Sequence, residues 1–205
     1  MATTAKPSGM TTVLNLPNQL TITRLALSIV LFGFIAWQWY LTSLVLFIIA
    51  ASTDWLDGYF ARKYGMVTTL GRILDPFADK VIICGTFVFL VAIPNSGLHE
   101  LGLQAWVVVL VVGRELLITG LRSFLEQQGA DFSASMSGKL KMVAQCVCAG
   151  TSLAYLAWPT TMGVSVAEIP AWLPMMVRIS VWATVVLTAY SGVAYIVAAV
   201  KLMRK

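Results

Sequence analysis

Charged side chains are scarce in this sequence, since Asp, Glu, Lys and Arg make up 11% of its 205 residues. An ordinary soluble domain carries about 25% charged residues. Hydrophobic residues reach 59% of the chain, and a chain of this length has too little polar sequence to cover so much apolar surface in water. The composition therefore excludes an ordinary soluble domain and predicts an integral membrane protein.

Histidine and cysteine are also rare, with one His and three Cys in the chain. Cys84, Cys146 and Cys148 lie inside apolar runs, without the even number and loop positions of a disulfide framework. We expect them to pack as small side chains. His99 stands beside Glu100 in a polar segment and is interpreted as a solvated loop residue, so a histidine-based zinc site has no ligands to build on.

The N-terminal residues 1–13 form a polar stretch without the cleavage pattern of a signal peptide, and we expect a polar tail that is not removed. No internal repeat divides the remainder, so residues 14–205 are predicted to form a single membrane domain. Residues 15–24 mix polar and apolar side chains around Pro17. This short segment could lie along the membrane interface or simply begin the first helix.

Six apolar stretches approach the roughly 20 residues that a spanning helix needs. They predict an all-α integral membrane protein with six transmembrane helices and a short N-terminal interfacial segment. The predicted spans are residues 20–40, 41–62, 72–93, 103–124, 140–158 and 178–200. Pro159, Pro170 and Pro174 are expected to break the chain before the last span.

Basic residues give the orientation, because lysine and arginine near span ends prefer the cytoplasmic side. One side of the predicted topology receives Lys6, Arg24, Lys63, Arg72, Arg122, Lys139, Lys141, Lys201, Arg204 and Lys205. The opposite links carry His99, Glu100 and Glu168, and Arg178 is the basic residue expected to snorkel there. Both termini are therefore predicted to be cytoplasmic. The net charge of +5 fits anionic lipids or phosphorylated substrates and gives no reason to expect nucleic acid.

Four of the nine acidic residues fall within residues 54–80, at the junction of predicted spans two and three. An aspartate inside a spanning helix costs on the order of 2.5–3.5 kcal/mol on insertion scales, so several together indicate a bound ligand or an ion pathway. Asp54 and Asp57 share one face of the first helix, and Asp75 and Asp79 lie one turn apart on the second. Antiparallel folding of the two helices would bring all four carboxylates together.

Carboxylate oxygens without histidine or thiolate suit Mg²⁺ or Mn²⁺, with Ca²⁺ as a competitor. Four carboxylates suggest two metal ions, which neutralise the cluster and can orient a diphosphate. Gly58, Ala61 and Gly71 leave a gap for a phosphate-bearing ligand, although close helix packing is the alternative. Arg62 and Thr68 add donors for phosphate oxygens.

These residues resemble a known signature. The pattern Asp54-x-x-Asp57-Gly58-x-x-Ala61-Arg62, eight residues, Gly71-x-x-x-Asp75-x-x-x-Asp79 is similar, without a mismatch, to that of the CDP-alcohol phosphatidyltransferases. Enzymes of that family have six spanning helices, bind Mg²⁺ or Mn²⁺, and move a substituted phosphate from a CDP-linked donor to an alcohol, releasing CMP. The resemblance implies that Asp54, Asp57 and Asp75 are metal ligands, and that Asp79 is near the metals and is the general base. It also implies a homodimer.

The same resemblance implies which residues bind the CDP donor. They are Gly58, Ala61, Arg62 and Thr68, with Gly71 beside them. Asn18 and Thr21 recur with Arg24 at helical spacing and could face the nucleotide, or could cap a helix next to an interface arginine. A positioned carboxylate at Asp79 would accept the proton of the attacking alcohol, and a route through an aspartyl adduct stays open.

Three further stretches, at residues 16–24, 113–122 and 138–141, resemble bacterial members of the family whose acceptor is sn-glycerol 3-phosphate. This implies that CDP-diacylglycerol and glycerol 3-phosphate react to give phosphatidylglycerol phosphate and CMP. It also implies that the protein lies among the lipids of a bacterial cytoplasmic membrane, with its active site facing the cytoplasm. Inositol phosphate, serine or phosphatidylglycerol are alternative acceptors. A divalent-cation transporter is the alternative from another class, and it leaves the ordered glycines and Arg62 unexplained.

The acceptor phosphate needs cations, and four basic residues are candidates. Arg114 lies well inside the fourth predicted span, where a guanidinium needs an anionic partner. Adjacent residues point about 100° apart on a helix, so we expect Arg114 and Glu115 not to neutralise one another directly, and Glu115 to hold another basic group. Arg122, Lys139 and Lys141 would complete the site, unless they only follow the positive-inside rule.

Overall fold

The computed structural model describes residues 16–64, 69–127 and 136–203, and within residues 16–21, 53–64, 69–76, 78–79, 126–127, 136–137 and 202–203 it describes the backbone alone. These ranges contain helices and no strand, which confirms the all-α prediction for the described chain. The helices are α1 (Leu16–Ala36), α2 (Tyr40–Tyr64), α3 (Thr69–Ala92), α4 (Ala105–Gln127), α5 (Met136–Met162) and α6 (Trp172–Met203), with a 3₁₀ turn at Val166–Glu168. Each predicted span overlaps one of the six.

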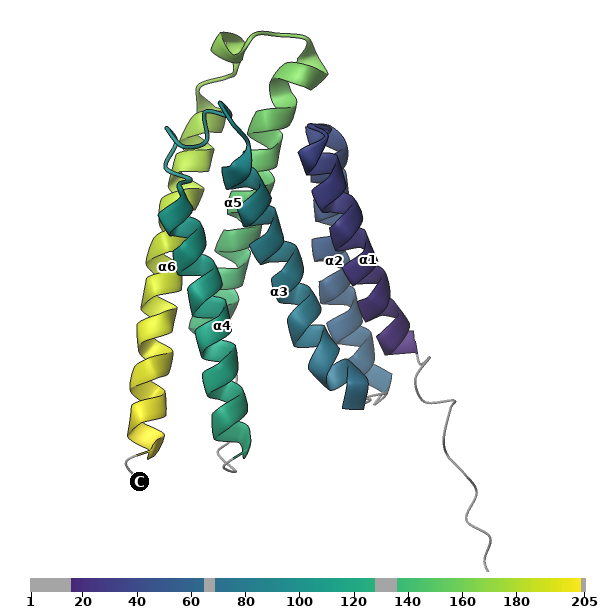
Figure 1. The fold of residues 1–205 in the computed structure, drawn as a ribbon, viewed down its shortest axis with the longest axis vertical. Coiled ribbons are helices and arrows are strands. Elements are labelled where there is room, and N and C mark those ends of the chain that lie inside the picture. Colours follow the sequence, from purple (N-terminus) through teal and green to yellow (C-terminus); the bar gives the residue numbers. More distant parts are fainter. Residues whose placement is uncertain (1–15, 65–68, 128–135, 204–205) are drawn as a thin grey trace, which may run out of the picture.

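The six helices form an elongated bundle (Figure 1). α1 packs against α2 and α3, α4 packs against α3 and α6, and α5 packs against α2, α3 and α6. The core between them is apolar, with Leu31 of α1, Phe87 and Leu90 of α3 and Leu153 of α5 fully buried. α3 therefore links the two sides of the bundle, since it contacts α1, α4 and α5.

Three prolines were predicted to break the chain before the last span, but two of them lie within helices. Pro159 lies inside α5, which continues to Met162, and Pro174 lies in the first turn of α6. A proline is tolerated in a first turn because the N–H that it lacks would have no partner within the helix. α1 is a continuous helix from Leu16, which favours simple helix entry over a separate interfacial segment.

The surface of the bundle is apolar along the middle of its helices. Ile29, Val109, Leu116, Val186 and Val193 are all exposed by more than half. A soluble monomer rarely leaves so much apolar surface in contact with water. Two of the helices, over Gly138–Met162 and Trp172–Lys201, are long and apolar enough in the described chain to cross a membrane.

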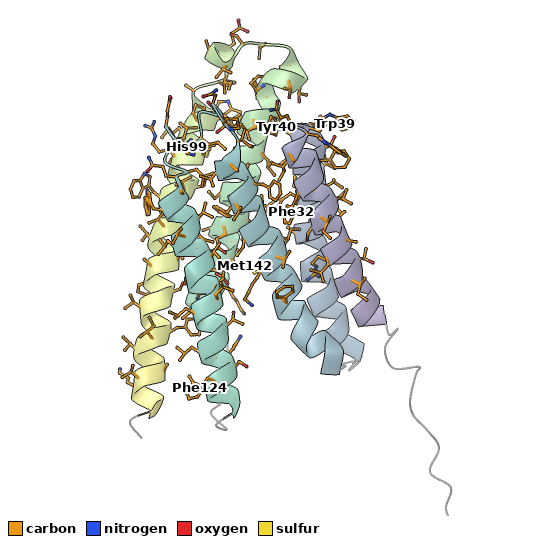
Figure 2. The ribbon with its side chains drawn as sticks, in the orientation of Figure 1. Phe32, Trp39, Tyr40, His99, Phe124 and Met142 are labelled. Atoms are coloured by element: carbon orange, nitrogen blue, oxygen red, sulfur yellow. The ribbon has the colours of Figure 1, made fainter. Side chains whose placement is uncertain are left out.

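The loop and cysteine predictions agree with the structure. His99 is exposed in the segment between α3 and α4, at the same end of the bundle as Trp39 and Tyr40 and opposite to Phe124 (Figure 2). All three cysteines are free thiols, and Cys148 is buried in the core. None of them therefore contributes a disulfide.

α1 and α3 approach closely at Gly85, which gives a prediction for the fold. A Cβ atom on Gly85 would overlap with Cζ of Phe32, whose ring stacks on Phe89 with centroids 5.0 Å apart. Because the stacked ring has little room to move, we expect Gly85→Ala to destabilise the fold by about 1–3 kcal/mol. Thermal unfolding in detergent measures the loss. Gly33→Ala is the matched control, since its Cβ meets nothing within 4 Å; equal melting temperatures for the two variants would contradict this packing.

Candidate active site

The backbone places the four aspartates at matching depths on α2 and α3. At 1.5 Å per residue, Asp57 and Asp75 lie about 10 Å from the facing ends of their helices, and Asp54 and Asp79 lie about 15 Å from them. Five peptide steps join Tyr64 to Thr69, so these ends are at most about 18 Å apart. The four positions therefore form two levels near one end of the bundle. Their carboxylates are predicted to form an all-oxygen donor set, which suits Mg²⁺ or Mn²⁺.

The side chains of this region are outside the described residues, so their assignments stay predictions. Asn18 and Thr21 lie on the backbone of α1, Gly58, Ala61 and Arg62 on that of α2, and Gly71 on that of α3, while Thr68 is outside the described ranges. Among the side chains that the structure does describe, no three of His, Cys, Asp and Glu come close enough to hold a metal ion. The predicted metal ligands are the four aspartates, and their side chains lie outside the described residues.

A small cleft lies one turn beyond the aspartate levels. It is lined by Arg24 of α1, Ala51 of α2, Ile82 and Ile83 of α3 and Met142 of α5, with Phe47, Ala50 and Cys146 completing the wall. Ala51 precedes Asp54 by three residues, and Ile82 follows Asp79 by three. Arg24 is only 5% exposed, so its side chain is buried among the neighbouring helices. A buried cation in an apolar cleft is suited to a lipid phosphate.

A second polar centre joins α4 and α5. The ammonium group of Lys141 donates a hydrogen bond to Oε1 of Glu115, and Nη1 of Arg114 lies 3.3 Å from the same oxygen. All three side chains are at least nine-tenths buried. Figure 2 labels Met142, the residue next to Lys141 on α5. One carboxylate faces two cations here, so the cluster has a net charge of about +1 and can accept an anion.

This geometry corrects one expectation and supports another. Arg114 and Glu115 do pair directly, contrary to the prediction from their 100° separation, because the long arginine side chain bends across that angle. Glu115 also holds a second basic group, as predicted, and that group is Lys141. Sequence spacing gives the direction of Cβ atoms but not the reach of a flexible side chain.

Arg114 also contacts an aromatic ring. Its guanidinium carbon lies 5.4 Å from the centroid of the Tyr195 ring, within the range of a cation–π interaction. Gly192, one turn earlier on α6, leaves room for the stem, because a Cβ there would lie 3.4 Å from Cγ of Arg114. Neither Tyr195 nor Gly192 was predicted from the sequence, since neither residue carries charge or belongs to a motif.

The other two acceptor candidates lie apart from this pair. Arg122 follows Arg114 by two turns on α4 and is half-buried, whereas Lys139 is exposed near the start of α5. The structure therefore brings together Arg114 and Lys141 through Glu115, and leaves Arg122 and Lys139 nearer the end of the bundle. That arrangement could guide an anion inward before the buried pair binds it.

Comparison with known proteins matches this chain to a family over most of its length. A family model described as CDP-alcohol phosphatidyltransferase matches residues 14–190. CDP-diacylglycerol–glycerol-3-phosphate 3-phosphatidyltransferase of Bacillus subtilis is 37% identical over 155 residues, which are 68% of this chain and 76% of that protein. The protein of the same name from Salmonella typhimurium is 32% identical over 194 residues, 90% of this chain and 94% of the relative. The matched region contains both the aspartates and the basic cluster.

Proposed function

The chain belongs to the CDP-alcohol phosphatidyltransferase family, and from that premise we propose that it transfers a phosphatidyl group from CDP-diacylglycerol to sn-glycerol 3-phosphate. The products are phosphatidylglycerol phosphate and CMP. The observation that carries the acceptor is the buried pair of Arg114 and Lys141, which offers two cations to a phosphate. The relatives named for this reaction support the same choice.

The aspartates carry the chemistry in this proposal. Asp54, Asp57 and Asp75 would hold two divalent ions, Mg²⁺ or Mn²⁺, which would supply charge stabilisation to the diphosphate when bound. Asp79 accepts the proton of the primary hydroxyl of the acceptor. That oxygen forms a bond to the phosphorus bearing diacylglycerol, the bond from this phosphorus to the bridging oxygen breaks, and CMP leaves with its electron pair. The matched depths of the four positions on α2 and α3 support the arrangement.

The donor and the acceptor approach from different sides in this proposal. The CDP moiety contacts Asn18 and Thr21 of α1 and the stretch Gly58, Ala61, Arg62, Thr68 and Gly71, while its acyl chains enter laterally from the bilayer. The acceptor phosphate binds between α4 and α5, at Arg114 and Lys141, after Arg122 and Lys139 have attracted it.

We propose further that residues 14–205 form one domain whose six helices all cross the cytoplasmic membrane, with both termini and the active site on the cytoplasmic side. The exposed tryptophans support this topology. Trp37 and Trp39 lie at the junction of α1 and α2, and Trp106 and Trp172 at the starts of α4 and α6. Helices that alternate in direction bring these positions to one end of the bundle, where an aromatic belt marks an interface.

An assay of acceptor choice tests the function. Purified protein receives CDP-diacylglycerol, Mg²⁺ and one candidate alcohol at a time: glycerol 3-phosphate, inositol phosphate, serine or phosphatidylglycerol. We expect CMP release with glycerol 3-phosphate to exceed that with each other alcohol. Equal or faster release with another acceptor would overturn the assignment. Metal-dependent ion flux in proteoliposomes without CMP release would instead support a transporter.

Removal of metal gives a separate prediction. Because four clustered carboxylates need cations to bind a diphosphate, a chelator should abolish CMP release, and added Mg²⁺ or Mn²⁺ should restore it. Donor binding measured with a non-reacting CDP analogue should fall in parallel. Full CMP release in excess chelator would contradict the metal-dependent part of the proposal.

A further inference from the structure

Two buried nitrogen donors flank the ion pair of Lys141 and Glu115. They are Nε2 of Gln145 on α5 and Nε of Arg114 on α4, and neither finds a hydrogen-bond acceptor within the described part of the chain. Gln145 is only 1% exposed, so its amide cannot turn to bulk water. A buried donor without a partner weakens the fold, and native proteins retain few of them.

Other buried polar groups do not call for a ligand in the same way. Ser152 and Thr188 also lack partners in the described chain, but a hydroxyl in a helix can rotate to the carbonyl four residues earlier at little cost. Thr86 and Thr119 make that bond, to Ile82 and Glu115 respectively. The amide of Gln145 has no comparable local partner. An apolar residue of similar shape at position 145 would avoid the cost of burying an amide. The presence of Gln145 therefore indicates a ligand that binds to this amide.

Gln145 is placed to meet the same ligand as Lys141. The two residues are four apart on α5, so they lie on one face of the helix about 6 Å apart along its axis. Side chains on an α-helix lean toward its N-terminal end, which directs the amide of Gln145 toward the turn that carries Lys141. The donor therefore lies one turn from Lys141, further from the end of the bundle where α5 begins.

We propose that Gln145 determines acceptor specificity by donating a hydrogen bond to the hydroxyl of glycerol 3-phosphate that does not react. This inference rests on the proposed function. In that acceptor the secondary hydroxyl is on the carbon next to the one that bears the phosphate ester. A phosphate held by Arg114 and Lys141 thus places this hydroxyl one turn from Lys141, at Gln145. The ligand class is a polyol phosphate, and a phosphate lacking the second hydroxyl leaves the amide unpaired.

The test compares two acceptors that differ in this hydroxyl alone, sn-glycerol 3-phosphate and 3-hydroxypropyl phosphate. We expect wild-type protein to prefer the first by about tenfold or more in kcat/KM, because sites built to bond a substrate hydroxyl reject its analogue. In Gln145→Met, which keeps the length of the side chain but has no donor, the preference should fall below about threefold, through a loss with glycerol 3-phosphate alone. Ser152→Ala is the matched control on the same face of α5 and should keep the wild-type preference.

An unchanged preference in Gln145→Met would overturn the inference, as would an equal loss with both acceptors, which indicates a structural role. If Gln145→Met does not fold, Gln145→Leu, whose side chain has neither a donor nor an acceptor, should lose the preference in the same way. Absence of CMP release by wild-type protein with glycerol 3-phosphate would contradict the proposed function itself, and this inference with it. The two failures are distinguishable because one concerns wild-type activity and the other concerns the preference of the variant.

Discussion

Asp79→Asn should reduce kcat by about 10²–10⁴-fold, the usual contribution of a general base, while CDP-diacylglycerol still binds. The amide keeps the shape of the side chain but cannot accept the proton of the acceptor hydroxyl. Asp79 lies on α3, level with Asp54 on α2, so a base at this position can serve a substrate held by the other carboxylates. Single-turnover CMP release measures the rate, and equilibrium binding of the donor measures the retained affinity.

Asp54→Asn provides the contrast. As a proposed metal ligand it should weaken the metal-dependent binding of CDP-diacylglycerol, because neutralising one carboxylate lowers the affinity for the ions. The two variants thus separate proton transfer from donor binding. Wild-type turnover in Asp79→Asn would refute its role as the base, and burst formation of CMP without acceptor would favour an aspartyl adduct.

Lys141→Met should raise KM for glycerol 3-phosphate by about 10- to 100-fold and leave KM for CDP-diacylglycerol unchanged. Hydrogen bonds to charged groups contribute about 1.5–3 kcal/mol, and every 1.4 kcal/mol is a factor of ten in affinity. Lys141 is buried and is held by Glu115 alone among the described contacts. Its flexible stem can therefore pass from that carboxylate to an acceptor phosphate, while Arg114 keeps its contact with the Tyr195 ring.

Steady-state kinetics with each substrate varied in turn measure the effect. Lys201→Met is the control, since it removes an exposed lysine at the end of α6. In the single variant Glu115 loses the ammonium group of Lys141, which can destabilise the fold. The double variant Glu115→Gln with Lys141→Met removes both charges of this pair and therefore controls for that loss. Equal increases in both KM values, or none in either, would contradict an acceptor site at Lys141.

The helices were largely predictable because each predicted apolar stretch overlaps one of them. The differences arise at prolines, since Pro174 fits the first turn of α6 and Pro159 is accommodated near the end of α5. Hydropathy reports where apolar residues accumulate, but the position of a helix end also depends on which backbone donors need partners. The close contact of Gly85 with Phe32 depends on two helices and is not visible in either sequence stretch alone.

The candidate site was predictable to a different degree in its two halves. The aspartates stand out because several carboxylates near a membrane are costly, and the backbone of α2 and α3 gives them matching levels. In the acceptor half, the sequence indicated that Glu115 would hold a basic group but missed its bond to Arg114. Gln145 gave no signal, because an uncharged amide becomes informative only when its burial and its missing partner are known.

Oxygen labelling tests the central claim most directly. Purified protein is supplied with CDP-diacylglycerol, Mg²⁺ and glycerol 3-phosphate whose primary hydroxyl carries ¹⁸O, and both products are analysed by mass spectrometry. Attack by that hydroxyl on the lipid-bearing phosphorus predicts that phosphatidylglycerol phosphate contains the label and that CMP does not. Formation of CMP without labelled phosphatidylglycerol phosphate, or label appearing in CMP, would contradict the account.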